Sequence, residues 1–208
     1  MLVNNETGVL MPVEAAGAAL KRKSPRGVLH VDAVQAFGKL PFRPEKLHAQ
    51  LVTISAHKIH GPKGIGALYQ APALHIPPRT FGGGQEKGLR SGTESVPLIA
   101  GFGAAVKELP DLSKELERMK ELNVRCRELL QKIPGVLFNS PPDALPYILN
   151  LSAGTVRAET MLHFLASHQI FVSSGSACSG GKPSHVLAAM GLPAQRIQSA
   201  LRLSFSRE

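Results

Sequence analysis

The sequence predicts an α/β fold, in which part of a sheet domain is followed by a small α+β domain. Three short runs rich in aliphatic residues are bounded by turn residues, as is typical of buried strands: residues 28–31, 51–55 and 65–69. Helical stretches at residues 14–22 and 95–107 lie before and after these runs. Strands interleaved with helices favour a sheet whose strands are mostly parallel.

A long amphipathic helix is predicted at residues 111–133, because apolar side chains recur there at steps of three and four. These side chains are Leu112, Leu116, Met119, Leu122, Cys126, Leu129 and Ile133. The strand-like segments that follow are residues 136–138, 147–152 and 170–173, with a helix near residues 159–167. We therefore expect residues 1–110 to belong to the large domain and residues 111–208 to form the small one.

The composition of the 208 residues, 43% apolar and 19% charged, is that of a folded globular protein. The two cysteines, Cys126 and Cys178, are far apart, which argues against a disulfide framework and against a cysteine-rich zinc site. No apolar run approaches the roughly 20 residues that a membrane helix requires, and the first residues do not resemble a signal peptide. We expect a reducing, cytoplasmic location.

The net charge is +9, and a basic surplus can indicate a nucleic-acid partner. Apart from residues 21–23, however, the basic residues are scattered, and the chain has no Trp and only two Tyr to stack on bases. We therefore expect no direct binding of nucleic acid, and we expect a few of the cations to bind anionic small molecules.

Two polar residues follow predicted strands at what would be one edge of the sheet. Asp32 comes directly after residues 28–31, and Lys58 follows residues 51–55. Ligands of open α/β sheets bind at the carboxyl ends of strands, and a carboxylate at an apolar strand end needs a cationic partner. The pyridinium nitrogen of pyridoxal phosphate is such a partner, and Gln35 could reach the phenolic oxygen of the same ring. The alternatives are that Asp32 caps the helix after it and that Lys58 is a solvated surface charge.

Two further stretches offer groups that bind anions. Residues 82–93 are rich in Gly, Ser and Thr, whose amides and hydroxyls can hold a phosphate, although a plain flexible loop has the same composition. Arg202 lies in an apolar, strand-like run, where its guanidinium could bind the carboxylate of a substrate. An internal salt bridge is the alternative for Arg202.

The two cysteines have different surroundings in the sequence. Cys126 falls on the apolar face of the long helix, so we expect a buried, unreactive thiol. Cys178 lies in a stretch of small polar residues, 173–181, where a thiol is accessible enough to act as a nucleophile. A redox-sensing thiol is the competing interpretation of Cys178.

Five motifs in this order resemble those of the cysteine desulfurases. They are VNNETG at residues 3–8, HVDAVQ at 30–35, SAHKIHGPKG at 55–64, RSGT at 90–93 and SSGSAC at 173–178. The last motif is similar to that of the NifS/IscS-type branch, and the resemblance extends over essentially the whole chain. It implies a homodimer with the aminotransferase-like fold type I of pyridoxal-phosphate-dependent transferases (class V). Residues 1–110 would be the C-terminal part of its cofactor-binding domain.

The resemblance also implies a role for each matching residue. Lys58 would hold the pyridoxal phosphate, with Asp32 paired to the pyridinium. The other cofactor contacts would come from Asn5, Gln35, Ser55, His57 and Thr93, of which Thr93 would reach the phosphate in the partner subunit. Arg202, with Asn5, would hold the carboxylate of L-cysteine. Lys58 would then move the Cα proton, and the Cys178 thiolate would take the sulfur as a persulfide and release alanine.

Family members carry an N-terminal half that supplies a Gly-Gly-Thr phosphate loop and a His stacked on the cofactor, and neither is found in this sequence. The Asn-Asn-Glu motif is internal in the family, so we expect a truncated chain with weak cofactor retention and little turnover. The loop after Cys178 is also shorter than in members that serve iron–sulfur assembly. The sulfur acceptor would be an iron–sulfur scaffold or a tRNA-thiolation enzyme. The alternatives are a selenocysteine lyase and a non-catalytic remnant that binds a desulfurase partner.

Overall fold

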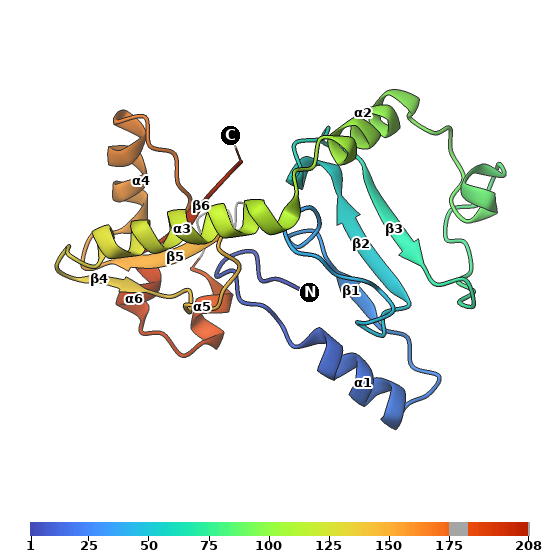
Figure 1. Ribbon diagram of the computed structural model, residues 1–208, viewed down its shortest axis with the longest axis horizontal. Coiled ribbons are helices and arrows are strands. Elements are labelled where there is room, and N and C mark those ends of the chain that lie inside the picture. The colour runs from blue at the N-terminus through green and yellow to red at the C-terminus, as the bar shows by residue number, and fades with distance from the viewer. Residues whose placement is uncertain (175–182, 208) are drawn as a thin grey trace. The chain divides into compact units, whose positions relative to one another are not determined.

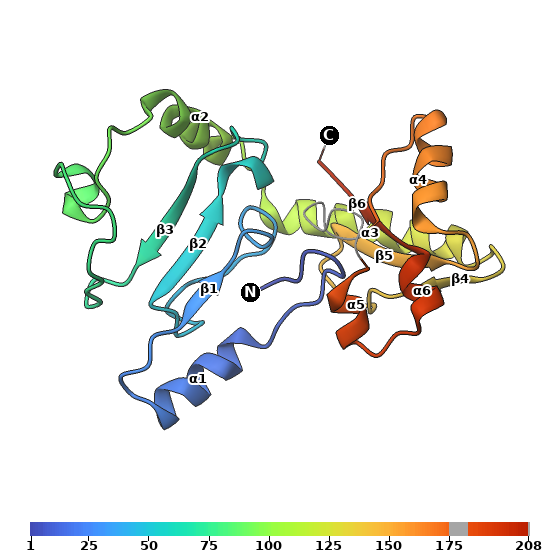
Figure 2. The same cartoon turned by 180° about the vertical axis from the view of Figure 1, so that it is seen from behind.

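The computed structural model describes residues 1–174 and 183–207, which divide into two compact units. The first unit consists of residues 1–2 and 12–112, and the second of residues 3–11 and the described residues from Ser113 onward. Residues 3–11, which we expected in the large domain, therefore cluster with the small one. Figures 1 and 2 show the elements of both units.

The first unit is built around a three-stranded sheet with the order β1 (His30–Asp32), β2 (Leu51–Ser55), β3 (Gly66–Gln70). β1 and β2 are parallel, as expected, but β3 runs antiparallel to β2. Only residues 56–65 connect β2 to β3, which is too short for the crossover of a dozen or more residues that a parallel strand requires. The sheet is therefore mixed rather than parallel (Figure 1).

The two faces of this sheet differ in polarity. Successive strand residues point to opposite faces, and the parallel register pairs Val31 with Val52 and Asp32 with Thr53. Val31 and Val52 are buried, whereas Asp32 and His30 on the opposite face are exposed. His30 Nε2 lies 2.6 Å from Thr53 Oγ1 on this polar face.

The helices α1 (Val13–Lys23) and α2 (Val96–Lys107) confirm the two predicted helical stretches. A long loop between β3 and α2 contains the short 3-10 helix η2 (Gln85–Gly88). Glu86 and Lys87 within η2 have φ angles of 50° and 56°, a left-handed conformation that is uncommon for residues other than Gly.

The second unit contains an antiparallel sheet with the order β4 (Val136–Phe138), β5 (Ile148–Ala153), β6 (Ala200–Ser204). α3 (Leu112–Leu130) runs along one face of this sheet, and α4 (Ala158–Ser167) follows β5 (Figures 1 and 2). The buried centre is formed by Leu151, Ala158 and Leu201, with the partly buried Leu130 of α3 packed against it. Two short helices that we did not predict, α5 (His185–Ala189) and α6 (Ala194–Gln198), precede β6.

The strand predicted at residues 170–173 is absent. Only Ser173 pairs, in an isolated bridge with Arg202. Ile170 and Phe171 are 51% and 83% exposed, so the apolar residues that suggested a strand do not contribute to a buried one.

The long helix α3 is confirmed, but only part of the predicted stripe lies on its buried face: Leu112, Leu116 and Cys126 are partly buried. Met119 is fully buried, whereas Leu122 and Leu129 are 40% and 56% exposed. The polar Asn123 is buried instead, because its Nδ2 donates to the Pro146 carbonyl oxygen at 2.9 Å. Neither α3 nor any other described helix is long and apolar enough to span a membrane.

Cys126 on α3 is half-buried, so it is not the core residue that we expected. Burial raises the pKa of its thiol, and the neighbouring Arg127 acts in the opposite direction. A raised pKa leaves little of the thiolate, which agrees with the expectation of an unreactive group.

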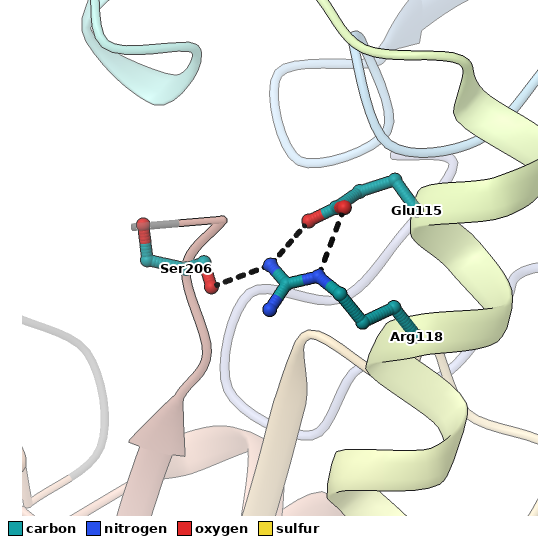
Figure 3. Close-up of polar contacts among 3 residues, drawn as sticks. All are labelled: Glu115, Arg118 and Ser206. Atoms are coloured by element: carbon teal, nitrogen blue, oxygen red, sulfur yellow. Dashed lines mark hydrogen bonds and ion pairs between the residues drawn. The ribbon is translucent and has the colours of Figure 1, made fainter.

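The contact between α3 and the residues after β6 is polar (Figure 3). Arg118 binds the Glu115 carboxylate through Nη2 at 2.7 Å and through Nε at 3.1 Å. Its Nη2 also donates to the Ser206 carbonyl oxygen at 3.4 Å. The hydrogen bond from Arg118 lowers the pKa of Glu115.

Candidate active site

The carboxyl ends of β1 and β2 bring together four of the predicted site residues. Asp32 ends β1 and Ser55 ends β2, and parallel pairing places both ends at one edge of the sheet. The 3-10 helix η1 (Ala56–Lys58) follows β2 without a gap and carries His57 and Lys58. The local sequence explains this turn, because Ala56 and Ile59 are buried and leave the polar residues between them outside the core.

The Asp32 carboxylate is exposed, and its Oδ1 accepts the Val34 backbone N–H at 2.9 Å. The residues after Asp32 form successive turns rather than the helix that we considered, so the carboxylate caps a turn. Gln35 is half-buried in these turns, between the fully buried Ala33 and Ala36. Asp32 and Gln35 are thus held by one short, well-anchored segment.

Ser55 and His57 form a hydrogen-bonded pair, with Ser55 Oγ and His57 Nδ1 2.7 Å apart. His57 is exposed, and Lys58 beside it is half-buried. A hydroxyl, an imidazole and an ammonium group at one strand end are a suitable set of donors for an anionic ligand. Lys58 is only partly buried, so the alternative of a solvated surface charge remains open.

Thr93 belongs to a different segment of the chain, the loop that leads into α2. It lines a cavity of about 470 Å³ together with Arg90 and Phe102. Some amides expected to cradle a phosphate are used within the loop: Gly92 N donates to Gln85 Oε1 at 3.2 Å. Within the described residues, no hydrogen bond joins Thr93 to the residues at the strand ends.

Arg202 and Asn5 are brought together in the second unit. Arg202 lies in β6 opposite Asn150 of β5, and its Nη1 donates to the Asn5 carbonyl oxygen at 3.0 Å. Its Nε is buried without a hydrogen-bond partner in the described part of the chain. Burial lowers the pKa of Arg202, and the charge of Glu6 opposes this shift.

The internal salt bridge that we considered for Arg202 is not formed with any carboxylate of residues 1–174 or 183–207. A buried guanidinium nitrogen without a partner carries a free-energy cost that a bound planar anion would remove. The geometry of Arg202 therefore favours an anionic ligand over a structural ion pair.

Sequence reasoning missed one buried pair beside Arg202, formed by Glu6 and Ser184. Glu6 is 2% exposed, and its carboxylate accepts the hydroxyl of Ser184. The same Ser184 oxygen accepts the Leu187 N–H at 3.1 Å and so caps α5. A Ser before a short apolar helical run is a known capping signal, but nothing in the local sequence points to Glu6 as its partner.

The predicted nucleophile Cys178 lies outside the described residues, as do residues 175–182. On both sides of residues 175–182, described residues form hydrogen bonds within the second unit. Ser173 and Arg202 exchange two backbone hydrogen bonds, with N to O distances of 3.1 Å and 2.6 Å. Ser184, on the other side of the gap, binds Glu6.

The chain is similar to known proteins over its whole length. The model of the aminotransferase class-V family matches residues 1–208. The chain is 42% identical to a cysteine desulfurase of Nostoc sp. and 40% identical to the cysteine desulfurase IscS of Proteus mirabilis, and it covers 52% of each. The structure of a NifS-like protein from Rickettsia africae superposes with a TM-score of 0.87 at 35% identity.

That superposition covers 99% of this chain and 55% of the Rickettsia protein. The chain thus spans about half the length of the curated relatives that it matches. The match is nevertheless continuous over its own residues, with the mixed α/β fold described above. The chain belongs to the class-V aminotransferases, a family of enzymes that depend on pyridoxal phosphate.

Proposed function

We propose that this chain is the part of a cysteine desulfurase that binds pyridoxal phosphate and accepts the sulfur of L-cysteine. The observation that carries this proposal is the gathering of Asp32, Ser55 and Lys58 at the carboxyl ends of two adjacent parallel strands. Open α/β sheets bind their ligands at such an edge. The names of the relatives support the choice of cysteine as substrate.

The residues at this edge fit the groups of pyridoxal phosphate. Lys58 would hold the cofactor, and the exposed Asp32 carboxylate would face its protonated ring nitrogen. Ser55 and His57, which already share a hydrogen bond of 2.7 Å, would donate to the phosphate. Gln35 would contact the ring oxygen. When bound, the cofactor supplies an electron sink for the bond that breaks at Cα of the substrate.

Thr93 is assigned to the phosphate of the partner subunit in a homodimer. Thr93 lies in the loop before α2, and in the described residues no hydrogen bond joins it to Ser55 or His57. The homodimer itself is part of the proposal.

The substrate carboxylate is assigned to Arg202 and Asn5. The partnerless Nε of Arg202 supports this assignment, because a planar carboxylate accepts two hydrogen bonds from one guanidinium. The Nη1 bond to the Asn5 carbonyl oxygen fixes the orientation of the guanidinium plane. Arg202 would therefore orient L-cysteine through its carboxylate.

Two residues of the chain would carry out the reaction: Lys58 would transfer the proton and Cys178 would take the sulfur. Lys58, displaced by the substrate amine, would move the Cα proton as a general base and acid. The Cys178 thiolate would attack the substrate sulfur, so that an S–S bond forms while the Cβ–S bond breaks. The electron pair of that bond would stay on the carbon skeleton, which takes up a proton and leaves as L-alanine. Cys178 would keep the sulfur as a persulfide.

The persulfide would be passed to an acceptor protein, either an iron–sulfur scaffold or a tRNA-thiolation enzyme, in the cytoplasm. Because the relatives have about as much chain again, we propose that residues from that additional part complete the cofactor site. This chain by itself would then retain the cofactor weakly and turn over slowly.

The cofactor proposal is tested by trapping. The chain is incubated with pyridoxal phosphate, reduced with borohydride and digested, and the added phosphopyridoxyl mass is located by peptide mass spectrometry. We expect the label on Lys58, its loss in Lys58→Ala, and its retention in Lys63→Ala, which changes an exposed lysine of the following loop. Scattered labelling, or labelling that Lys58→Ala leaves unchanged, would contradict the proposal.

A further inference from the structure

A chain of side-chain hydrogen bonds runs through the second unit from α6 to the turn at residues 5–7. It begins at Arg196 of α6, whose Nε donates to Asn139 Oδ1 at 2.7 Å. Asn139 Nδ2 donates to Asn150 Oδ1 of β5 at 2.8 Å. Asn150 Nδ2 then donates to the Glu6 carbonyl oxygen at 3.2 Å. Figure 2 shows α6 beside β5, the strand that carries the chain onward.

The direction of this hydrogen-bond chain is set at Arg196. A guanidinium donates hydrogen bonds but cannot accept them, so the Asn139 atom that faces it has to be the oxygen. The nitrogen of Asn139 then faces Asn150, which accepts with its oxygen and turns its own nitrogen towards Glu6. Asn139 and Asn150 are 5% and 0% exposed, so both amides depend on protein partners. One cation therefore fixes the orientation of two buried amides.

The hydrogen-bond chain ends beside the group that orients Arg202. Asn150 and Arg202 are directly opposite each other in β5 and β6, so their side chains lie on the same face of the sheet. Asn150 holds the carbonyl oxygen of Glu6, and Arg202 Nη1 donates to that of the preceding residue, Asn5. These two carbonyl groups belong to adjacent rigid peptide units of one turn, so a shift of one moves the other. The orientation of the Arg202 guanidinium thus depends on the amide of Asn150.

We propose that Arg196 is a positioning residue for Arg202 and acts through the amides of Asn139 and Asn150. Without Arg196, both amides can reverse, and the Asn150 oxygen would then face the Glu6 carbonyl oxygen. Two acceptors repel each other, so the turn would shift and release the guanidinium of Arg202.

The consequence for the substrate rests on the proposed function, in which Arg202 binds the carboxylate of L-cysteine. A guanidinium that is already oriented loses less conformational freedom when the carboxylate binds. Arg196 would in this way contribute to substrate affinity without touching the substrate. The orientation of Arg202 itself can be measured without substrate or cofactor.

The alternative is a purely structural role, in which Arg196 only fastens α6 to the end of β4. Arg196 Nη2 donates to the Phe138 carbonyl oxygen at 2.7 Å, and this bond stabilises the unit whichever way Asn139 points. Loss of Arg196 would then lower the free energy of unfolding and leave Arg202 unchanged. The two roles can be separated, because only the positioning role depends on the direction of the amides.

The test follows Arg202 by nuclear magnetic resonance in the full chain with isotope-labelled arginine. The Nε–H signal of Arg202 is identified by its disappearance in Arg202→Lys, and nitrogen relaxation measures the order of that bond. We expect an ordered Nε–H in the native chain, and in Arg196→Met a shifted signal and loss of the order. Arg196→Lys should retain most of the order, because an ammonium group also only donates and so keeps the direction of the amides.

Asn139→Asp tests the direction with Arg196 in place. The carboxylate still accepts from Arg196 but cannot donate to Asn150, so the Asn150 amide should reverse and Arg202 should lose its order. Met119→Ala is the matched control, because it removes a fully buried side chain of α3 in the same unit, outside the hydrogen-bond chain. It should lower the free energy of unfolding and leave the Arg202 signal unchanged.

Circular dichroism and urea denaturation show whether each variant is folded under the conditions of the measurement. The proposal is overturned if Arg202 keeps its order in a folded Arg196→Met or Asn139→Asp chain. It is also overturned if Arg196→Lys or Met119→Ala disturbs Arg202 as much as Arg196→Met does. Because no cofactor is added, an Arg202 that depends on Arg196 would uphold the positioning role even if pyridoxal phosphate failed to label Lys58.

Discussion

Arg202 Nη1 donates to the carbonyl oxygen of Asn5 at 3.0 Å, while the Nε of the same guanidinium is buried without a partner in the described residues. The two residues are 197 positions apart in the sequence. A guanidinium held at one end and unsatisfied at the other is oriented for a ligand, at some cost in stability.

Replacing Arg202 by Met should therefore change the free energy of unfolding little. The lost bond to Asn5 contributes about 1 kcal/mol, and removal of a buried, unsatisfied donor returns about 1–3 kcal/mol. We expect Arg202→Met to lie within about 2 kcal/mol of the native chain in urea denaturation. A loss above about 3 kcal/mol would mean that Arg202 is structural. The same variant should lose L-cysteine turnover if Arg202 binds the carboxylate, which an alanine-release assay with added cofactor measures.

Breaking the hydrogen bond between the buried residues Glu6 and Ser184 should, by contrast, lower the free energy of unfolding. Ser184→Ala leaves the Glu6 carboxylate, which is 2% exposed, without this donor and removes the cap of α5. We expect a loss of about 1–3 kcal/mol in the free energy of unfolding. Ser95→Ala is the matched control, because Ser95 stands at the N-cap of α2 but its side chain makes no capping bond. Equal losses for the two variants would argue against a stabilising role for the pair.

Tyr147 should make the stability of the second unit sensitive to high pH. Burial raises the pKa of Tyr147 from 10.0 to about 12, and the Glu115 carboxylate adds to the shift. A raised pKa in the folded state means that the stabilisation is complete below pH 10 and is lost as the pH rises towards 12. Tyr147→Phe should therefore flatten the decline of stability between pH 10 and 12, as followed by urea denaturation at each pH. A decline of equal steepness in the variant would assign it to other groups.

The elements that could be predicted from the sequence are those with a strong local signal. The aliphatic run of β2 predicts the strand, and the candidate site residues Ser55, His57 and Lys58 lie at its carboxyl end. The direction of β3 follows from the length of the connection rather than from its composition. The run Ile170-Phe171 has strand composition but no partner strand, and composition does not reveal the difference.

Contacts between distant segments could not be predicted, because no local pattern encodes them. Residues 3–11 cluster with the second unit, where Ser140 Oγ donates to the Thr7 carbonyl oxygen at 2.6 Å. Glu6 meets Ser184 across 178 positions of sequence. The motif around Glu6 could be matched to a family, but its neighbours in space emerge only from the folded chain.

The buried face of α3 offers a direct comparison between the predicted and the observed helix. The stripe read from the sequence treats Met119 and Leu122 as equivalent, whereas the structure buries Met119 completely and leaves Leu122 40% exposed. Met119→Ala should cost about 2–5 kcal/mol, because it removes a buried side chain and leaves a cavity. Leu122→Ala should cost less than about 1 kcal/mol, as is usual for residues outside the core.

Urea denaturation of the two variants, followed by circular dichroism, measures this difference. Both substitutions introduce alanine into the interior of the same helix, so helix propensity affects them almost equally. The difference between the two losses in free energy of unfolding then measures the contribution of burial. Equal costs, or a larger cost for Leu122→Ala, would show that the predicted stripe is the buried face. A cost for Met119→Ala alone would confirm that the face of the helix that carries Met119 and Asn123, and not Leu122, is the buried one.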